Sequence, residues 1–372
     1  MSPTSPYPDR RAGQRARTPD ERADAAGDRS SVRLADDPVR TPLSHTAPVF
    51  DRGSAALAKA REGAQLGARA VVSWARTYVL PPRYPPDSRM TLHADDGVRL
   101  AAVELSGPPD APCTIVLVHG LLNWSRAPRI RAFAELLARD VHVVVPDLRG
   151  HGASGGCSTL GLEEPRDVDA AVRAAKVIHP ELPVVTVGWS LGGAAALLHA
   201  GLFGGVAGAV GLSSPAWSAS VDRPGARRVA RWAGSPGGRL VLGTLLRTRI
   251  CAGCPEVPDS GPVVDAISPA FILLVHDPAD SYFGPEHPEQ IMTWAREPKE
   301  LWWVPGGGHG TDLLTPGLAG RILEHVRGRL GDSREGREPR AHDRAPAHAH
   351  DSAGRVGAGS LGLHAAGRSD GE

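Results

Sequence analysis

The stretch Val184-Val-Thr-Val-Gly-Trp-Ser-Leu-Gly-Gly193 decides the fold, because a β-branched run passes through a glycine-flanked serine into a helix-forming segment. Gly188, Ser190 and Gly192 form a G-x-S-x-G pattern between that strand and that helix. Such a turn forces the serine into strained backbone, and side chains at the glycines would collide with neighbouring backbone. It also lifts the hydroxyl to the carboxyl edge of a sheet, beside a helix N-terminus that can stabilise an oxyanion. We interpret Ser190 as a nucleophile; the alternative is a surface serine in a glycine-rich turn.

The composition excludes several classes of protein. The chain has 372 residues, 41% of them hydrophobic and 22% charged, which suits a globular protein. A net charge of +1 without a basic block argues against a nucleic-acid partner. The apolar stretches fall short of the roughly 20 residues of a membrane span, and the N-terminus lacks a signal-peptide pattern. We therefore expect a cytoplasmic protein with no membrane span.

Composition also divides the chain into segments. Residues 1–52 are polar and proline-rich and are expected to be disordered. Residues 53–88 are expected to form an N-terminal helix and a linker. Strand and helix patterns alternate over 89–330, interrupted at about 215–268 by an Arg-, Gly- and Pro-rich insertion that we interpret as a small cap. Residues 331–372 form a second tail that is expected to be disordered.

The alternating segments predict an α/β fold. A hairpin signal at Asp95-Asp96-Gly97 precedes buried β-branched runs such as Thr114–Val118 and helical patterns such as Glu163–Ile178. A hairpin followed by repeated strand–helix units predicts a mostly parallel sheet of about eight strands covered by helices.

In this context the G-x-S-x-G turn resembles the nucleophile elbow of the α/β-hydrolase superfamily, in its esterase- and lipase-like serine hydrolase branch. The resemblance covers roughly residues 89–330 and implies the α/β-hydrolase fold with Ser190 as nucleophile. The turn His119-Gly-Leu121 resembles the family's H-G-x motif, which implies the backbone N–H groups of Leu121 and Leu191 as oxyanion donors. The loop from Asp147 to Ser154 resembles the family's D-x-x-G-x-G-x-S segment, which is not directly catalytic.

Two later segments resemble the family's acid and base loops. His276-Asp-Pro-Ala-Asp280 resembles H-G-x-x-D and implies Asp280 as the catalytic acid, although Asp277 stands where glycine is usual and leaves the choice of aspartate open. Gly306-Gly-Gly-His309 resembles the loop that carries the catalytic histidine, so the resemblance implies His309, with His276 and His287 as rivals.

Weaker features concern the pocket and the cysteines. Trp189, Tyr282 and Phe283 are candidate pocket residues, and the segment that holds the last two resembles one found in uncharacterised actinobacterial hydrolases. The Cys251-Ala-Gly-Cys254 pair lacks the further ligands of a zinc site and is interpreted as ordinary cap cysteines that could form a disulfide. Cys113 and Cys157 are expected to be inert. Because no metal, nucleotide or flavin motif is present, no cofactor or metal is expected.

These residues together predict a carboxylesterase-like serine hydrolase that cleaves a small-molecule carboxylic ester or thioester through an acyl-enzyme on Ser190. The alternatives are an amidase, peptidase or acyltransferase with the same three residues, or a hydrolase-fold binding protein. The sequence does not identify the acyl group of the substrate or the oligomeric state of the protein.

Overall fold

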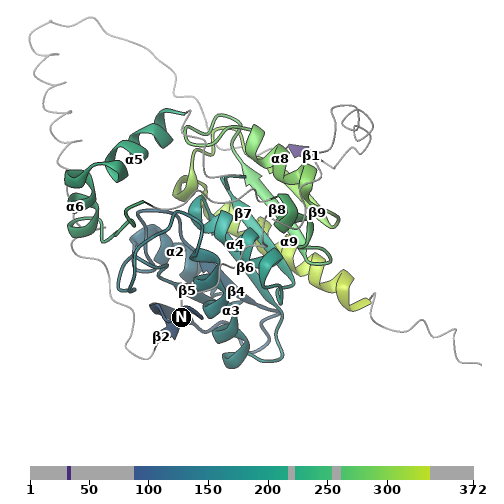
Figure 1. Ribbon diagram of the computed structural model, residues 1–372. Coiled ribbons are helices and arrows are strands. Elements are labelled where there is room, and N and C mark those ends of the chain that lie inside the picture. Colours follow the sequence, from purple (N-terminus) through teal and green to yellow (C-terminus); the bar gives the residue numbers. More distant parts are fainter. Residues whose placement is uncertain (1–31, 35–87, 217–222, 254–260, 336–372) are drawn as a thin grey trace, which may run out of the picture. The chain divides into compact units, whose positions relative to one another are not determined.

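A nine-stranded sheet forms the centre of the part of the chain that the computed structural model describes, namely residues 32–34, 88–216, 223–253 and 261–335 (Figure 1). The strands are β1 (Val32–Leu34), β2 (Arg89–His93), β3 (Arg99–Leu105), β4 (Thr114–Val118), β5 (His142–Pro146), β6 (Val184–Trp189), β7 (Gly208–Leu212), β8 (Phe271–His276) and β9 (Lys299–Trp303). Their order is β1-β9-β8-β7-β6-β4-β5-β3-β2. The β2–β3 and β3–β5 pairs are antiparallel and the other pairs are parallel.

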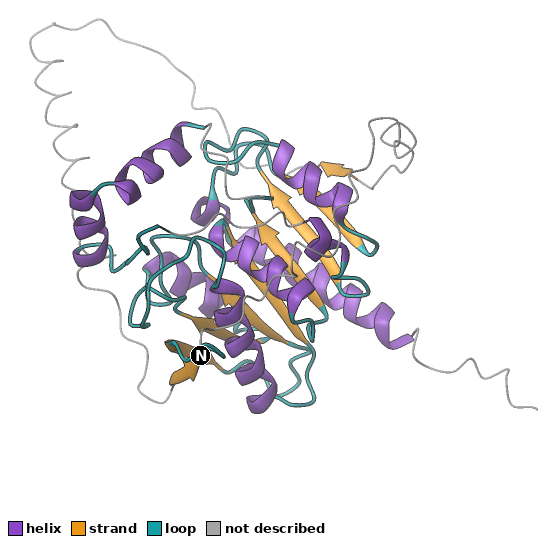
Figure 2. Ribbon diagram, in the orientation of Figure 1, coloured by secondary structure: helices purple, strands orange, loops and turns teal. Residues whose placement is uncertain are grey.

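Helices cover both faces of the sheet (Figure 2). They are α2 (Pro128–Leu137), α3 (Glu164–Ile178), α4 (Leu191–Leu202), α5 (Pro224–Gly234), α6 (Pro236–Thr244), α7 (Gly261–Asp265), α8 (Glu286–Trp294) and α9 (Pro316–Glu335). Residues 332–372 separate from the rest of the chain as a second unit, of which only the end of α9 is described. None of the described helices is both long enough and apolar enough to cross a membrane.

Strand alternation assigns the two faces to different helices. On β4, Ile115 and Leu117 join a core cluster with α2 and α9, whereas Val116 and Val118 join a cluster with α3 and α4. Every residue of β4 to β8 is buried, as expected for parallel strands covered on both faces. The carboxyl ends of these strands therefore share one edge of the sheet, where the loops that follow them can meet.

The predicted α/β-hydrolase fold, with a mostly parallel sheet covered by helices, is confirmed. All eight predicted strands are present, and the first two form the predicted hairpin, whose turn includes Gly97 at a φ of +85°. Strand β1, which pairs in parallel with β9, was not predicted and lies in the segment expected to be disordered. The helix expected within residues 53–79 and nearly all of both tails lie outside the described residues. Helix α9 continues to Glu335, five residues beyond the predicted domain end at residue 330.

A disulfide joins Cys157, in the loop between β5 and α3, to Cys251, which follows the helices α5 and α6 of the cap insertion. This corrects the expectation that Cys157 is inert. The two cysteines are separated by 94 positions in the sequence, and sequence spacing alone does not reveal which chain segments meet. Disulfides persist in oxidising compartments, so this bond weighs against the expected cytoplasmic location, which stays a prediction.

We expect Cys157→Ser to lower the free energy of unfolding by about 2–4 kcal/mol, because the bond restricts the unfolded chain. Urea unfolding with and without reductant measures the change. Reductant should weaken the wild-type protein to the same degree and leave Cys157→Ser unaffected. Equal stability of the oxidised wild-type protein and the variant would contradict the bond.

Candidate active site

Ser190 stands at the sharpest turn of the sheet, between the end of β6 and the first residue of α4. Its φ is +52°, and its backbone N–H donates to the carbonyl oxygen of Leu212 on β7 at 2.9 Å. A Cβ on Gly188 would lie 2.4 Å from the carbonyl oxygen of Gly192, and one on Gly192 would lie 2.3 Å from that of Val118. Both positions therefore exclude any side chain, which is the physical reason for the glycines on either side of the serine.

A chain of hydrogen bonds links Ser190 to His309 and Asp280. The Ser190 Oγ lies 3.2 Å from the His309 Nε2, and the His309 Nδ1 lies 2.7 Å from the Asp280 Oδ2. With Nδ1–H donating to the carboxylate, Nε2 is free to accept the serine proton. The three residues come from the loops after β6, β8 and β9, so the sheet edge brings them together across 119 residues of sequence.

Asp280 is fully buried and its charge is compensated locally. Burial alone raises the pKa of this carboxyl, but the hydrogen bond and charge of His309 and the N–H groups of Tyr282 and Phe283 outweigh burial and hold it below its usual value. Those N–H groups donate to the Asp280 Oδ1 at 2.7 and 3.3 Å. Asp280 is therefore an ionised acceptor that can hold the imidazole in one tautomer.

Asp277, the second aspartate of the same loop, binds backbone N–H groups and not the imidazole. Its Oδ2 accepts the N–H of Gly308 at 2.7 Å, and its Oδ1 accepts the N–H of Ala279 at 2.9 Å. The side chain is buried and ties the loop of β8 to the residue before His309. The sequence left the choice of aspartate open; the geometry pairs Asp280 with the imidazole and Asp277 with the backbone that carries it.

Two of the three candidate pocket residues surround the imidazole. The Tyr282 ring stacks on the His309 ring with centroids 4.1 Å apart and 24° between the planes, and the Phe283 ring meets it edge-on at 5.5 Å. Trp189 differs, because only 1% of it is exposed and it belongs to the core cluster. Its ring packs under Gly120 and Gly310. Trp189 thus packs in the core next to Gly120 and Gly310, and its burial does not support the expectation of a pocket wall.

The rival histidines are engaged elsewhere. The His276 Nε2 lies 3.0 Å from the Phe283 carbonyl oxygen, and the His287 Nδ1 accepts the N–H of Ala216 at 3.1 Å. Burial lowers the pKa of His287 to about 4. Both rings therefore serve as hydrogen-bonding groups that shape loops, and His309 is the histidine that contacts Ser190.

Leu121 and Leu191 lie where oxyanion donors are expected in sequence. Leu191 is the first residue of α4, so its N–H is among those at the helix N-terminus that the helix itself leaves unpaired. Leu121 packs against the core cluster that contains Leu191, and its carbonyl oxygen accepts from the Asn123 side chain at 3.0 Å. That their N–H groups donate to an oxyanion is a proposal.

Two contacts near the site were not anticipated from the sequence. The Gly310 N–H donates to the Ser213 Oγ at 3.3 Å, and Ser213 itself has a φ of +47°. The Arg223 Nη1 donates to the Asp280 carbonyl oxygen at 3.0 Å. Ser213 and Arg223 belong to no recognisable sequence motif. Their contacts with the site become visible only when the loops that carry them come together in the structure.

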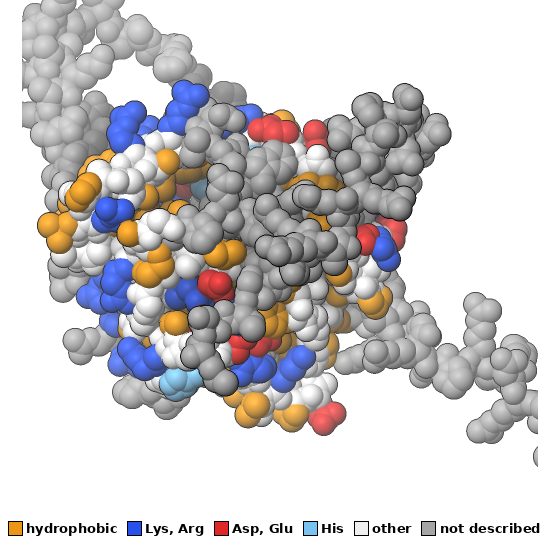
Figure 3. Space-filling view, in the orientation of Figure 1, with side chains coloured by type: hydrophobic (Ala, Val, Ile, Leu, Met, Phe, Trp, Pro, Cys, Tyr) orange, Lys and Arg blue, Asp and Glu red, His pale blue; other side chains and the backbone are white. Residues whose placement is uncertain are grey.

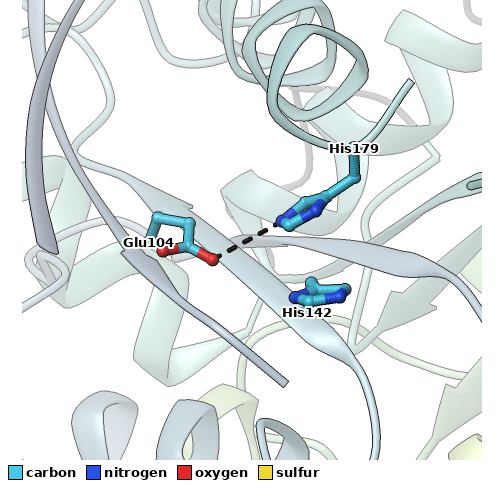
Figure 4. Close-up of side chains that lie close together, drawn as sticks. All are labelled: Glu104, His142 and His179. Atoms are coloured by element: carbon cyan, nitrogen blue, oxygen red, sulfur yellow. Dashed lines mark ion pairs between the residues drawn. The ribbon is translucent and has the colours of Figure 1, made fainter. Parts of the chain in front are cut away.

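One group within the described residues has the side chains of a metal site: Glu104, His142 and His179 (Figure 4). The potential ligand atoms lie within 4.8 Å of one another, whereas tetrahedral ligands about 2.0–2.1 Å from zinc lie closer together. The Gly107 N–H donates to the His142 Nδ1 at 3.0 Å, so the neutral ring carries its proton on Nε2 and offers no lone pair there. Burial and the neighbouring His179 lower the pKa of His142. These contacts favour a hydrogen-bonded cluster of stacked rings, 3.7 Å apart, over a metal site.

The sequence profile of the alpha/beta hydrolase family matches residues 115–329, more than half of the chain. The chain therefore belongs to the alpha/beta hydrolase family. It is similar to the uncharacterized protein YfhR of Escherichia coli O157:H7, with 27% identity over 234 residues that cover 58% of this chain and 71% of the relative. The YfhR protein of Salmonella typhi is 26% identical over 238 residues, covering 59% and 73% of the two chains.

A solved structure supports the same fold. The Pyrococcus furiosus esterase Pf2001 superposes with a TM-score of 0.52 and 20% sequence identity, covering 68% of this chain and 99% of the esterase. At this identity the likeness concerns the arrangement of strands and helices.

The buried ring of His119 predicts a loss of stability in acid. Its Nδ1–H donates to the Gly120 carbonyl oxygen at 2.9 Å and its Nε2 accepts the N–H of Leu148 at 3.0 Å, while burial lowers its pKa to about 4. As the pH falls, this histidine becomes protonated in the unfolded chain, near pH 6.5, before it does so in the folded protein. Its contribution to the free energy of unfolding is therefore fully present above about pH 6.5 and decreases by about 1.4 kcal/mol per pH unit towards pH 4.

Urea unfolding between pH 4 and pH 7 measures this dependence. The free energy of unfolding of His119→Asn should depend less steeply on pH than that of the wild-type protein. The difference in slope should correspond to one proton fewer taken up on unfolding. The exposed His93 provides the matched control, since His93→Asn should keep the wild-type slope. An unchanged slope in His119→Asn would contradict a neutral buried ring.

Proposed function

We propose that this alpha/beta hydrolase is a serine hydrolase that cleaves a small-molecule carboxylic ester or thioester through an acyl-enzyme on Ser190. The observation that carries the proposal is the hydrogen-bond chain from the Ser190 Oγ through His309 to Asp280, with separations of 3.2 and 2.7 Å. These distances lie within the reach that proton transfer between nucleophile and base requires.

In the proposed reaction the His309 Nε2 takes the proton of Ser190 as Oγ attacks the acyl carbon. The negative charge that develops on the acyl oxygen is stabilised by the N–H groups of Leu191 and Leu121, of which each is worth about 2.7–4 kcal/mol in such sites. His309 then gives its proton to the leaving alcohol or thiol, and water attacks the acyl-enzyme in the reverse sequence.

Two groups contact the imidazole that takes the proton in this proposed transfer. Asp280 compensates its charge at Nδ1, and the face of the Tyr282 ring lies 4.1 Å from the imidazole ring, where the π-system attracts a cation. Tyr282 and Phe283 also present aromatic surface at the site, which suits an apolar acyl group. The same arrangement supports amide cleavage or acyl transfer to another acceptor, so the substrates that acylate Ser190 and the nucleophiles that release the acyl group decide among them.

We expect a fluorophosphonate probe to label Ser190 in the wild-type protein, because its hydroxyl is activated and faces an oxyanion site. Mass spectrometry of the modified peptide locates the label, and nitrophenyl esters of graded acyl length measure turnover. Ser190→Ala should lose labelling and turnover while it keeps the fold. Labelling at another residue, or unchanged ester turnover in Ser190→Ala, would refute the mechanism and favour a hydrolase-fold binding protein.

The two aspartates of the loop after β8 provide a matched pair of variants. Asp280→Asn should lower kcat on the order of 10⁴-fold, because the amide no longer fixes the imidazole tautomer. Asp277→Asn keeps an acceptor for one of its two backbone partners, so we expect a loss of about tenfold from the misplaced loop. Steady-state kinetics of both variants test the assignment, and a larger loss in Asp277→Asn would reverse it.

A further inference from the structure

The segment from Arg223 to Ile250, here named the cap hairpin, has a composition unlike the rest of the chain. It contains α5 and α6 and carries seven arginines and no aspartate or glutamate, which corrects the expectation that this protein of net charge +1 has no basic block. The arginines are Arg223, Arg227, Arg228, Arg231, Arg239, Arg247 and Arg249. A local excess of this size creates a cationic surface that the overall balance conceals.

The cap hairpin also exposes large apolar side chains. Trp232 is 47% exposed, Leu240 67% and Leu245 46%. In α5 the buried residue is Gly225, and in α6 the buried residues are Gly238 and Leu242. Figure 3 shows hydrophobic and basic side chains interspersed over these two helices. Exposed apolar groups gathered on one surface indicate a binding site more often than chance exposure does.

The cap hairpin is fixed at its start to the loop that carries Asp280 and at its end to the loop between β5 and α3. At its start, the Gly225 N–H donates to the carbonyl oxygen of Ser281, the residue after Asp280, at 3.1 Å. At its end, the Arg249 side chain donates to the carbonyl oxygens of Ser154 and Gly156, and Cys251 forms the disulfide with Cys157. These contacts hold the start of the cap hairpin beside the loop that carries Asp280.

We propose that the cap hairpin docks on an anionic lipid surface and that the Ser190 site takes an acyl ester held at that surface. Arginines interspersed with tryptophan and leucine are the composition of helices that lie in a membrane interface. Negatively charged lipid headgroups complement the exposed arginines Arg228, Arg231 and Arg247, and the exposed tryptophan and leucines can enter the acyl boundary.

Other occupants fit this surface less well. A second copy of the chain, docked symmetrically, would place these exposed arginines against the same arginines of its partner. A nucleic acid would satisfy the charge, but its phosphate backbone offers nothing to the exposed leucines. The docking itself does not depend on the proposed function, whereas the identity of the substrate rests on it.

Flotation with phospholipid vesicles tests the docking with the full-length Ser190→Ala protein, so that hydrolysis cannot alter the lipid. The protein should float with vesicles of phosphatidylcholine containing phosphatidylglycerol, should bind phosphatidylcholine alone at least about tenfold more weakly, and should dissociate as salt is raised. Equal binding to both vesicles, or binding to neither, would overturn the proposal. Binding to duplex DNA without binding to vesicles would also overturn it and assign the surface to a nucleic acid.

Paired substitutions locate the surface. Arg228→Gln with Arg231→Gln should weaken vesicle binding by about fivefold or more per arginine, and Trp232→Ser with Leu240→Ser should weaken it comparably. The matched control, Arg139→Gln with Val177→Ser, removes one exposed arginine and an apolar side chain that is 81% exposed elsewhere on the domain, and should bind as before. Loss of binding in the control alone would refute the location.

Hydrolysis measured separately distinguishes the two proposals. In an otherwise wild-type background, the cap hairpin variants should keep turnover of a short water-soluble nitrophenyl ester, which also shows that they fold. Their turnover of an ester embedded in anionic vesicles should fall with vesicle binding. Vesicle binding without any esterase activity would leave the docking intact and refute the proposed function, whereas esterase activity without vesicle binding would do the reverse.

Discussion

The backbone turn at Ser190 is the constraint on which the rest of the site depends. A φ of +52° at the serine and the close approach of Gly188 to Gly192 hold the hydroxyl clear of the strand and at the start of α4. The turn is stable because β6 lies between β4 and β7 and the Ser190 N–H is bonded to the end of β7. The strain at one residue is thus supported by the central strands of the sheet.

The remaining parts of the site are arranged around the imidazole of His309. Asp280 contacts its Nδ1, and the backbone N–H groups that compensate Asp280 belong to the aromatic residues that flank the ring. The Asp277 carboxylate accepts a hydrogen bond from the backbone N–H of Gly308, the residue before His309. One short loop after β8 therefore supplies the carboxylate that contacts His309, the N–H groups that compensate its charge, the flanking aromatic rings and the hydrogen bond to Gly308. The alignment of these residues depends on few independent elements.

The cap insertion joins this arrangement to the surface of the protein. Arg223 and Gly225 bond to the acid loop, and the disulfide fixes the other side of the insertion to the loop after β5. A cap that is attached at both ends can present a charged and apolar surface without loosening the residues beneath it.

The sequence by itself determined the sheet, the tight turn at Ser190 and the order of Ser190, Asp280 and His309. Local patterns carry that information, because buried β-branched runs and glycines at crowded turns are required by neighbours along the chain. The tertiary structure alone decided which aspartate meets the imidazole, the burial of Trp189 and the pairing of Cys157 with Cys251. It also added β1 and the roles of Ser213 and Arg223. These features depend on contacts between loops far apart in sequence, and no local pattern specifies such contacts.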